Sequence, residues 1–83
     1  MPEIEWTKDA VADLQKIDKA IVKRILNKML WFSHHFHNIT PEPLLGDLSG
    51  TFKLRIGDWR VIYTIETDVI VVQAIGHRRE IYR

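Results

Sequence analysis

The sequence contains no cysteine among its 83 residues. This absence excludes a disulfide framework, a thiolate zinc site and a cysteine nucleophile, and it suits a protein of the reducing cytosol. Long hydrophobic runs are missing too, because the longest, such as 29–32 and 69–72, are far too short to cross a bilayer. The first residues carry neither a basic start nor an apolar stretch of signal-peptide length. We therefore expect a cytoplasmic protein with no membrane partner.

A large excess of charge of one sign is also absent, since the formal net charge is +1. A hydrophobic content of 46% with 28% charged residues is typical of globular proteins and excludes intrinsic disorder. The length allows a single domain, residues 1–83. The cations are unevenly distributed: five of the six in residues 1–50 are lysine, whereas five of the six in residues 51–83 are arginine. Arginine binds phosphate through two parallel hydrogen bonds, so the second half favours an anion site.

The first half of the chain predicts a short strand and two helices. Residues 3–6 alternate between acidic and apolar side chains, as a strand at a sheet edge does. Thr7 and Asp18 are typical N-cap residues, and apolar residues follow each of them at helical spacing. These apolar residues are Ala10, Val11, Leu14 and Ile17, then Ile21, Val22, Ile25, Leu26, Met29 and Phe32. We expect an antiparallel helical pair, or one helix with a break near Asp18.

The second half predicts an antiparallel meander. Residues 33–50 read as a connecting segment that is pinned to the core by Leu44, Leu45 and Leu48. Three alternating segments follow, near 52–56, 59–65 and 69–75, separated by turns at Gly57–Asp58 and Thr67–Asp68. The expected fold class is α+β: a short N-terminal strand and a two-helix hairpin packed on a three- to four-stranded, mainly antiparallel sheet.

The face of this sheet that points away from the helices gathers cations. If Gly57 and Asp58 form the loop, Arg55 lies opposite Arg60, with Lys53 on the same face. Opposed like charges destabilise a sheet, and neither strand offers a carboxylate near that point. We interpret the three cations as an anion site for which phosphate is the best geometric match. The alternative is a set of exposed cations on a solvated face.

The C-terminal residues add to this cationic face. A regular second hairpin places Arg60 opposite Ile75, so that 76–79 emerges beside the cations. The same alternation puts His77 on the face of Arg60 and Arg78 on the other face, so a bulge or bend near Gly76 is needed to bring Arg78 to the site. Tyr82 can supply an aromatic ring for stacking on a nucleobase. Cations with an aromatic ring and a histidine suit RNA phosphate chemistry.

Three segments carry a resemblance to a known family. They are Leu48–Ser49–Gly50, the run FKLRIGDWRVIY at 52–63 and the run GHRREIY at 76–82. These segments resemble the signature blocks of the RelE/ParE toxin superfamily, and the RelE branch more closely. The resemblance covers nearly the whole chain and implies the RelE-like microbial RNase fold and the toxin of a type II toxin–antitoxin pair. RelE-type toxins enter the ribosomal A site and cleave mRNA there, whereas ParE-type toxins poison DNA gyrase.

The same resemblance implies the partners and the site residues. The partners are a cognate antitoxin, the ribosome with its mRNA, and operator DNA bound by a toxin–antitoxin heterotetramer. The matching site positions are Lys53, Arg55, Arg60, Arg78 and Tyr82, which serve phosphate stabilisation, proton transfer and stacking in the family. No metal or other cofactor is needed for attack of the 2′-hydroxyl on phosphorus, because the arginines supply the charge.

The proton acceptor is left open between two residues. Arg55 stands where some relatives have lysine, and arginine is a very poor base. Lys53 is the better candidate, because neighbouring cations favour the neutral amine, and His77 is the alternative acid or base. Two other functions also remain open: a gyrase inhibitor of the ParE kind, and a degenerate toxin that acts only in antitoxin binding and operon autoregulation. His34 and His37 lack a third ligand, so we expect a polar helix end there and not a metal site.

Overall fold

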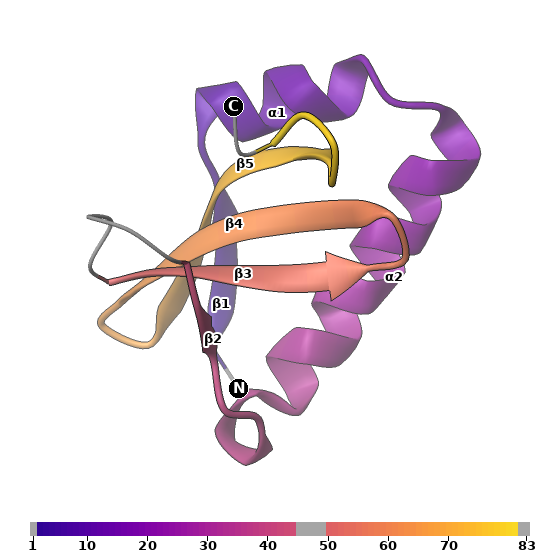
Figure 1. The fold of residues 1–83 in the computed structure, drawn as a ribbon. Helices are drawn as coiled ribbons and strands as arrows, with labels where there is room; N and C mark the ends of the chain where they lie inside the picture. The colour runs from indigo at the N-terminus through magenta and orange to yellow at the C-terminus, as the bar shows by residue number, and fades with distance from the viewer. Residues whose placement is uncertain (1, 45–49, 82–83) are drawn as a thin grey trace.

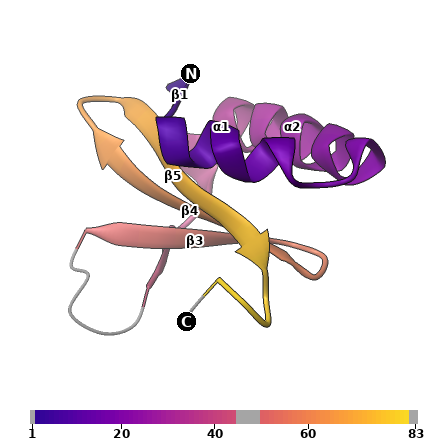
Figure 2. The same ribbon diagram turned by 90° about the horizontal axis from the view of Figure 1, so that it is seen from above.

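A five-stranded sheet organises the chain, of which the computed structural model describes residues 2–44 and 50–81. The strands are β1 (Glu3–Trp6), β2 (Glu42–Pro43), β3 (Thr51–Ile56), β4 (Trp59–Glu66) and β5 (Val69–His77), in the order β1-β5-β4-β3-β2. β1 runs parallel to β5, and the other pairs are antiparallel. Both helices lie on one side of the sheet, and the C-terminal turn lies on the other (Figure 2). The α+β prediction is confirmed, with β2 as an additional edge strand inside the segment expected to be a connection.

The two helices begin at the residues expected to cap them. α1 (Lys8–Gln15) follows Thr7, whose side chain accepts a hydrogen bond from the amide of Ala10, and α2 (Lys19–His34) follows Asp18, which caps Ala20 in the same way. A short 3-10 helix, η1 (Phe36–Asn38), comes after α2. α2 leaves the end of α1 at a steep angle, so the helices contact different parts of the sheet (Figure 1). No helix in the described part of the chain is long and apolar enough to span a membrane.

The core lies between the helices and the apolar face of the sheet. Its buried residues are Ala10 of α1; Ile25, Met29 and Phe32 of α2; and Ile56, Val61, Tyr63, Ile70, Val72 and Ile75 of the strands. Val11 and Leu26 were expected in the apolar stripes but are exposed, because each helix contacts the sheet along one side only. The first strand is also tied to the core, since the buried Ser33 hydroxyl donates to the carbonyl of Pro2.

The strand pairing of β5 departs from the regular register at Gln73. From Glu66↔Val69 to Tyr63↔Val72 the pairing follows the expected hairpin, and beyond that Ile62 pairs with Ala74. Gln73 is therefore the extra residue of a β-bulge, and every later residue of β5 changes face. Arg60 pairs with Gly76, so the expected pairing with Ile75 is wrong.

Thr7 and α1 satisfy backbone groups of β5 beyond the point where the pairing with β1 ends, at Val72. The Thr7 amide donates to the carbonyl of Val72, and the Thr7 hydroxyl donates to the carbonyl of Gln73 at 3.2 Å. An Asp13 carboxylate oxygen accepts from the amide of Ile75 at 2.9 Å. Because buried backbone groups are costly to leave unpaired, these bonds stabilise β5 on both sides of Gln73, the extra residue of the bulge.

Replacing Asp13 with alanine tests this role. We expect Asp13→Ala to lower the free energy of unfolding by about 1–3 kcal/mol, because the Ile75 amide loses its acceptor in a partly buried position. Asp9→Ala is the matched control, since Asp9 lies in the first turn of the same helix and its loss removes only a favourable dipole interaction of about 0.3–1 kcal/mol. Urea unfolding measures both. Equal losses of stability for the two variants would show that the hydrogen bond between the Ile75 amide and Asp13 contributes nothing.

β2 forms the other edge of the sheet, where Pro41 precedes the strand and Pro43 belongs to it. Glu42 pairs with Lys53, Pro43 pairs with Phe52, and the Leu44 amide donates to the carbonyl of Thr51 at 2.9 Å. By alternation, the backbone nitrogens of residues 41 and 43 point away from the sheet. Of the leucines expected to pin this segment, Leu45 and Leu48 lie outside the described residues.

Candidate functional site

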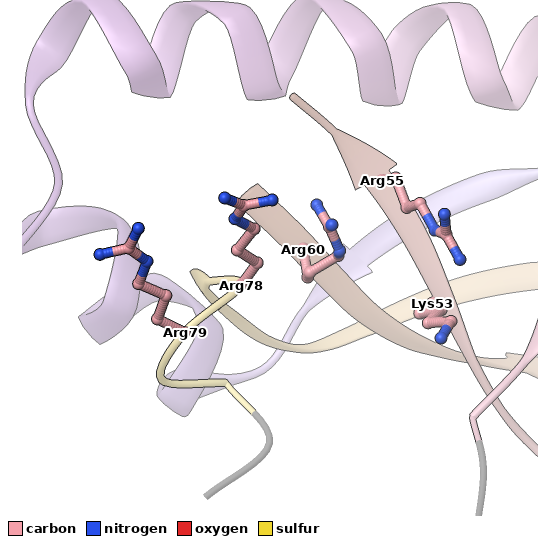
Figure 3. Close-up of a pocket in the computed structure, with 5 residues that line it drawn as sticks. All are labelled: Lys53, Arg55, Arg60, Arg78 and Arg79. Carbon is pink, nitrogen blue, oxygen red and sulfur yellow. The ribbon is translucent and has the colours of Figure 1, made fainter. Parts of the chain in front are cut away.

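Five cationic side chains line a shallow depression on the sheet face opposite the helices. They are Lys53, Arg55, Arg60, Arg78 and Arg79, and we call the depression of about 430 Å³ the cation pocket (Figure 3). β3 contributes the first two, β4 contributes Arg60, and the turn after β5 contributes the last two. Arg79 is an addition to the residues that the sequence singled out.

The first hairpin places its cations as expected. Arg55 pairs with Arg60, Lys53 pairs with Ile62, and the loop is Gly57–Asp58. Nη1 of Arg60 donates hydrogen bonds to the carbonyls of Gly57 and Trp59, at 2.8 and 2.9 Å. Within residues 2–44 and 50–81, no carboxylate lies within 4.0 Å of the Arg60 guanidinium. Arg60 is thus oriented by backbone oxygens and keeps further N–H groups for an anion.

Glu42 is the residue that the sequence reasoning missed. Its Oε2 lies 3.2 Å from Lys53 Nζ and 2.9 Å from an Arg55 Nη2, because β2 places Glu42 directly opposite Lys53. The expectation that no carboxylate stands near these cations considered only two strands and overlooked the third. Burial raises the pKa of Glu42, but the hydrogen bonds and positive charges of Lys53 and Arg55 outweigh it and hold the pKa below the ordinary value of 4.5. An ionised carboxylate therefore borders the cation pocket at neutral pH.

A second carboxylate stands at the opposite side of the pocket. Asp58 Oδ1 lies 3.6 Å from Arg78 Nε, and the Arg78 amide donates to the Asp58 carbonyl at 2.8 Å. This backbone bond ties the turn after β5 to the β3–β4 turn. Gly76 allows the turn to fold back, because a Cβ there would come within 2.9 Å of the side chain of Ile81. Arg78 therefore reaches the pocket from a position fixed by the backbone.

The structure separates His77 from the cations. His77 pairs with Trp59, and the two rings meet edge to face with centroids 5.5 Å apart. His77 does not line the cation pocket, so the expected shared face with Arg60 is wrong. The bulge at Gln73 is the reason, since it exchanges the faces of His77 and Arg78. An irregularity was expected near Gly76, and it lies three residues earlier. Tyr82 lies outside the described residues.

Tyr63 supports the pocket from the other face of the sheet. Its ring lies in the core against Phe32 and Phe52, with centroids 5.2 and 5.6 Å away. Burial, with a smaller contribution from the charge of Glu42, raises the pKa of Tyr63 to about 12. The phenol therefore stays protonated at any physiological pH and acts as a structural residue beneath the site.

The arrangement suits an anion that is bound and then acted upon. The cations outnumber the two bordering carboxylates, and guanidinium groups match the oxygens of phosphate. Glu42 adds a proton acceptor to the phosphate binders, which is the combination that phosphodiester cleavage by a neighbouring hydroxyl requires. Among residues 2–44 and 50–81, no group of three or more histidine, aspartate or glutamate side chains could hold a metal ion.

Comparison with known proteins agrees with the fold and identifies the family. The sequence model of the family described as "ParE toxin of type II toxin-antitoxin system, parDE" matches residues 4–82. The chain is 33% identical over 88 residues to Toxin RelG of Mycobacterium tuberculosis, covering 96% of this chain and 94% of that protein. The toxin–antitoxin complex RelBE2 of M. tuberculosis contains a similar chain, with a TM-score of 0.81, 27% identity and coverage of 94% and 100%. The isolated RelE toxin of E. coli shares the fold at 15% identity, with a TM-score of 0.75 and coverage of 99% and 92%. The chain therefore belongs to the RelE/ParE superfamily of toxins of type II toxin–antitoxin systems.

Proposed function

We propose that this toxin is an endoribonuclease that cleaves mRNA in the ribosomal A site and so stops translation in the cytoplasm. The observation that carries the proposal is the cation pocket with the Glu42 carboxylate at its border. A protein that only binds another protein has no need of five cations around one depression with an ionised carboxylate beside two of them. A phosphodiester cleaved by its own 2′-hydroxyl needs both kinds of group.

The residues divide the chemistry between them. Glu42 takes the proton from the 2′-hydroxyl as its oxygen attacks phosphorus, since this carboxylate is ionised and half exposed beside the pocket. Lys53, Arg60 and Arg78 neutralise the charge that develops on the phosphorane oxygens. The bond between phosphorus and the 5′ oxygen of the next nucleotide then breaks, and the leaving oxygen takes a proton from solvent water, to which the open pocket gives access. The products are a 2′,3′-cyclic phosphate and a 5′-hydroxyl.

The open shape of the cation pocket favours a reaction that takes place on the ribosome. The cation pocket is shallow and open, so it holds a phosphate without holding a nucleotide in one conformation. Aligning the 2′-hydroxyl with phosphorus can contribute several orders of magnitude to the rate. A ribosome that presents a fixed codon supplies this alignment, and purified toxin should cleave naked RNA slowly.

We also propose a cognate antitoxin as the protein partner. Several structural relatives of this chain are found in toxin–antitoxin complexes, among them RelBE2 of M. tuberculosis. Exposed apolar side chains on α1 and α2, among them Val11 and Leu26, offer surface for such a partner. A toxin–antitoxin heterotetramer on operator DNA would follow from the same pairing.

Expression of the toxin without its antitoxin tests the proposed reaction. We expect translation to stop first, and primer extension to reveal new mRNA ends inside translated reading frames. The second candidate is inhibition of DNA gyrase, which the match to the ParE toxin family favours. Arrest of replication with intact mRNA would support that candidate and contradict the proposal.

A further inference from the structure

A second basic depression runs from the cation pocket towards α2. It is lined by Arg24, Lys28, Trp31 and Arg55, and we call it the α2 groove. Arg55 borders the cation pocket as well, so the two depressions meet at this residue. β2 pairs with β3 only at Lys53 and Phe52, and the uncovered remainder of the β3 edge faces the groove. The groove is therefore continuous with the candidate site.

The groove carries an exposed aromatic ring between charged groups. Trp31 is 43% exposed, which is unusual for the largest apolar side chain in a protein of this size. Lys28 Nζ lies 3.9 Å from the centroid of the indole, and the ring of His35 stacks against it at 4.6 Å with planes 20° apart. The ammonium group of the flexible Lys28 side chain can leave this ring, and a planar aromatic ligand can then stack on it.

The other end of the groove is basic for a structural reason. The Arg24 guanidinium lies over the β3–β4 turn, where a Cβ on Gly57 would come within 2.9 Å of Arg24 Nη2. Gly57 also has φ +59, a backbone conformation that favours glycine. α2 thus contributes a guanidinium to the turn that also carries Asp58, at the border of the cation pocket. No described aspartate or glutamate lines the α2 groove itself.

We propose that the α2 groove binds single-stranded RNA that continues from the phosphate held in the cation pocket. A base stacks on Trp31 in place of Lys28, and Arg24 and Lys28 bind the flanking phosphates. Stacking on aromatic side chains together with a track of cations is how proteins hold single-stranded nucleic acid irrespective of sequence. The identity of the strand as the toxin's substrate rests on the proposed function, but the binding surface does not.

The test measures affinity for RNA that the toxin does not cleave. Fluorescence anisotropy compares a trinucleotide, which fills only the cation pocket, with an oligonucleotide of about ten nucleotides, both with 2′-deoxyribose replacing ribose at the cleavage position. We expect Trp31→Ala and Lys28→Ala each to weaken binding of the longer RNA about 10-fold and to leave the trinucleotide unaffected. Lys28→Ala should also reduce the salt dependence, because one phosphate contact is lost.

Two residues of the same helix provide matched controls. Lys23 is an exposed lysine and Leu30 is 56% exposed, and neither lines the α2 groove. We expect Lys23→Ala and Leu30→Ala to bind both RNAs as the unchanged protein does. Equal losses in control and groove variants, or no gain in affinity with length, would overturn the proposal. Circular dichroism confirms the fold of each variant, and Lys28→Ala carries the test alone if Trp31→Ala is unfolded.

The outcomes also separate this inference from the proposed function. If the groove variants keep RNA affinity but lose the antitoxin, the groove is a protein-binding site and the proposal is wrong. Length-dependent RNA binding without any cleavage on ribosomes would contradict the proposed reaction and leave the groove in place. Cleavage on ribosomes with unchanged RNA binding in both groove variants would contradict the groove alone.

Discussion

Glu42→Gln is expected to lower single-turnover cleavage on ribosomes by about 10²–10⁴-fold, the usual loss when a general base is removed. Glutamine keeps the size of the side chain and can still accept a hydrogen bond from Lys53 or Arg55, but it cannot take the proton of the 2′-hydroxyl. Quenched-flow cleavage of a programmed ribosome measures the chemical step separately from binding.

Asp58→Asn is the control, because Asp58 is also an exposed carboxylate paired with a cation of the pocket. We expect it to change the rate by less than about 10-fold, since it alters charge without removing a base. Equal effects of the two substitutions would show that Glu42 acts only as a counter-charge. The proton acceptor would then again be Lys53 or His77, as the sequence alone suggested.

The pH profile tests Glu42 as the base. The pKa of Glu42 is held below 4.5, so its carboxylate is ionised at every higher pH, and the rate should be level near neutrality and fall only in acid. A rate that instead changes steeply with pH near neutrality or above it would contradict Glu42 as the proton acceptor.

Arg60→Ala is the second large loss, expected at about 10²–10³-fold in the same assay, as for removal of one donor to a charged transition state. Arg60 lies between the cations of β3 and those of the C-terminal turn (Figure 3), and two backbone carbonyls hold its guanidinium. Arg60→Lys should restore little of the activity, because an ammonium group lacks the planar fork with which a guanidinium can be held by two carbonyls and still bind phosphate through two parallel hydrogen bonds.

Arg79→Ala and His77→Ala are the comparison for this loss. Arg79 points away from the other cations at one end of the pocket, and His77 lies against Trp59, so both should cost far less than Arg60. The stability of Arg60→Ala should change by about 1 kcal/mol or less, since one of its two bonds to carbonyls is exposed and the other is only partly buried. A larger fall in stability would mean that the lost activity reflects the fold, and a loss from His77→Ala greater than that from Arg60→Ala would contradict the assignment.

The sequence predicted those parts of the fold that depend on local patterns. The caps at Thr7 and Asp18, the two turns of the meander and the pairing of Arg55 with Arg60 are all as expected. Each depends on residues within a few positions of one another. The bulge was not located, because residues 69–72, 74 and 75 are all apolar and show no change of face. In the structure Ile70, Val72 and Ile75 all lie in the core, with spacings of two and then three, and a regular strand would have turned Ile75 to the face of Arg60.

The candidate site was predicted in its cations but not in its carboxylate. Lys53, Arg55, Arg60 and Arg78 share the pocket that the sequence suggested, whereas Glu42 joins them through the pairing of β2 with β3. The strand Glu42–Pro43 has only two residues, so it has no periodicity to recognise, and its register depends on its pairing with β3. His77 was misplaced for a similar reason, since the bulge that turns it away lies in a part of β5 that is hydrogen-bonded by side chains distant in the sequence, Thr7 and Asp13.

Pro41 and Pro43, at the β2 edge of the sheet, affect how the toxin can bind other proteins. Backbone nitrogens that point outward from an edge strand are the donors by which a foreign strand extends a sheet, and at residues 41 and 43 both belong to proline. Residues 41–43 therefore offer no outward-pointing amide to an incoming strand. A partner that contacts β2 docks through side chains or carbonyl groups, which leaves the hydrogen bonding of β2, and with it the position of Glu42, as it is in the toxin alone.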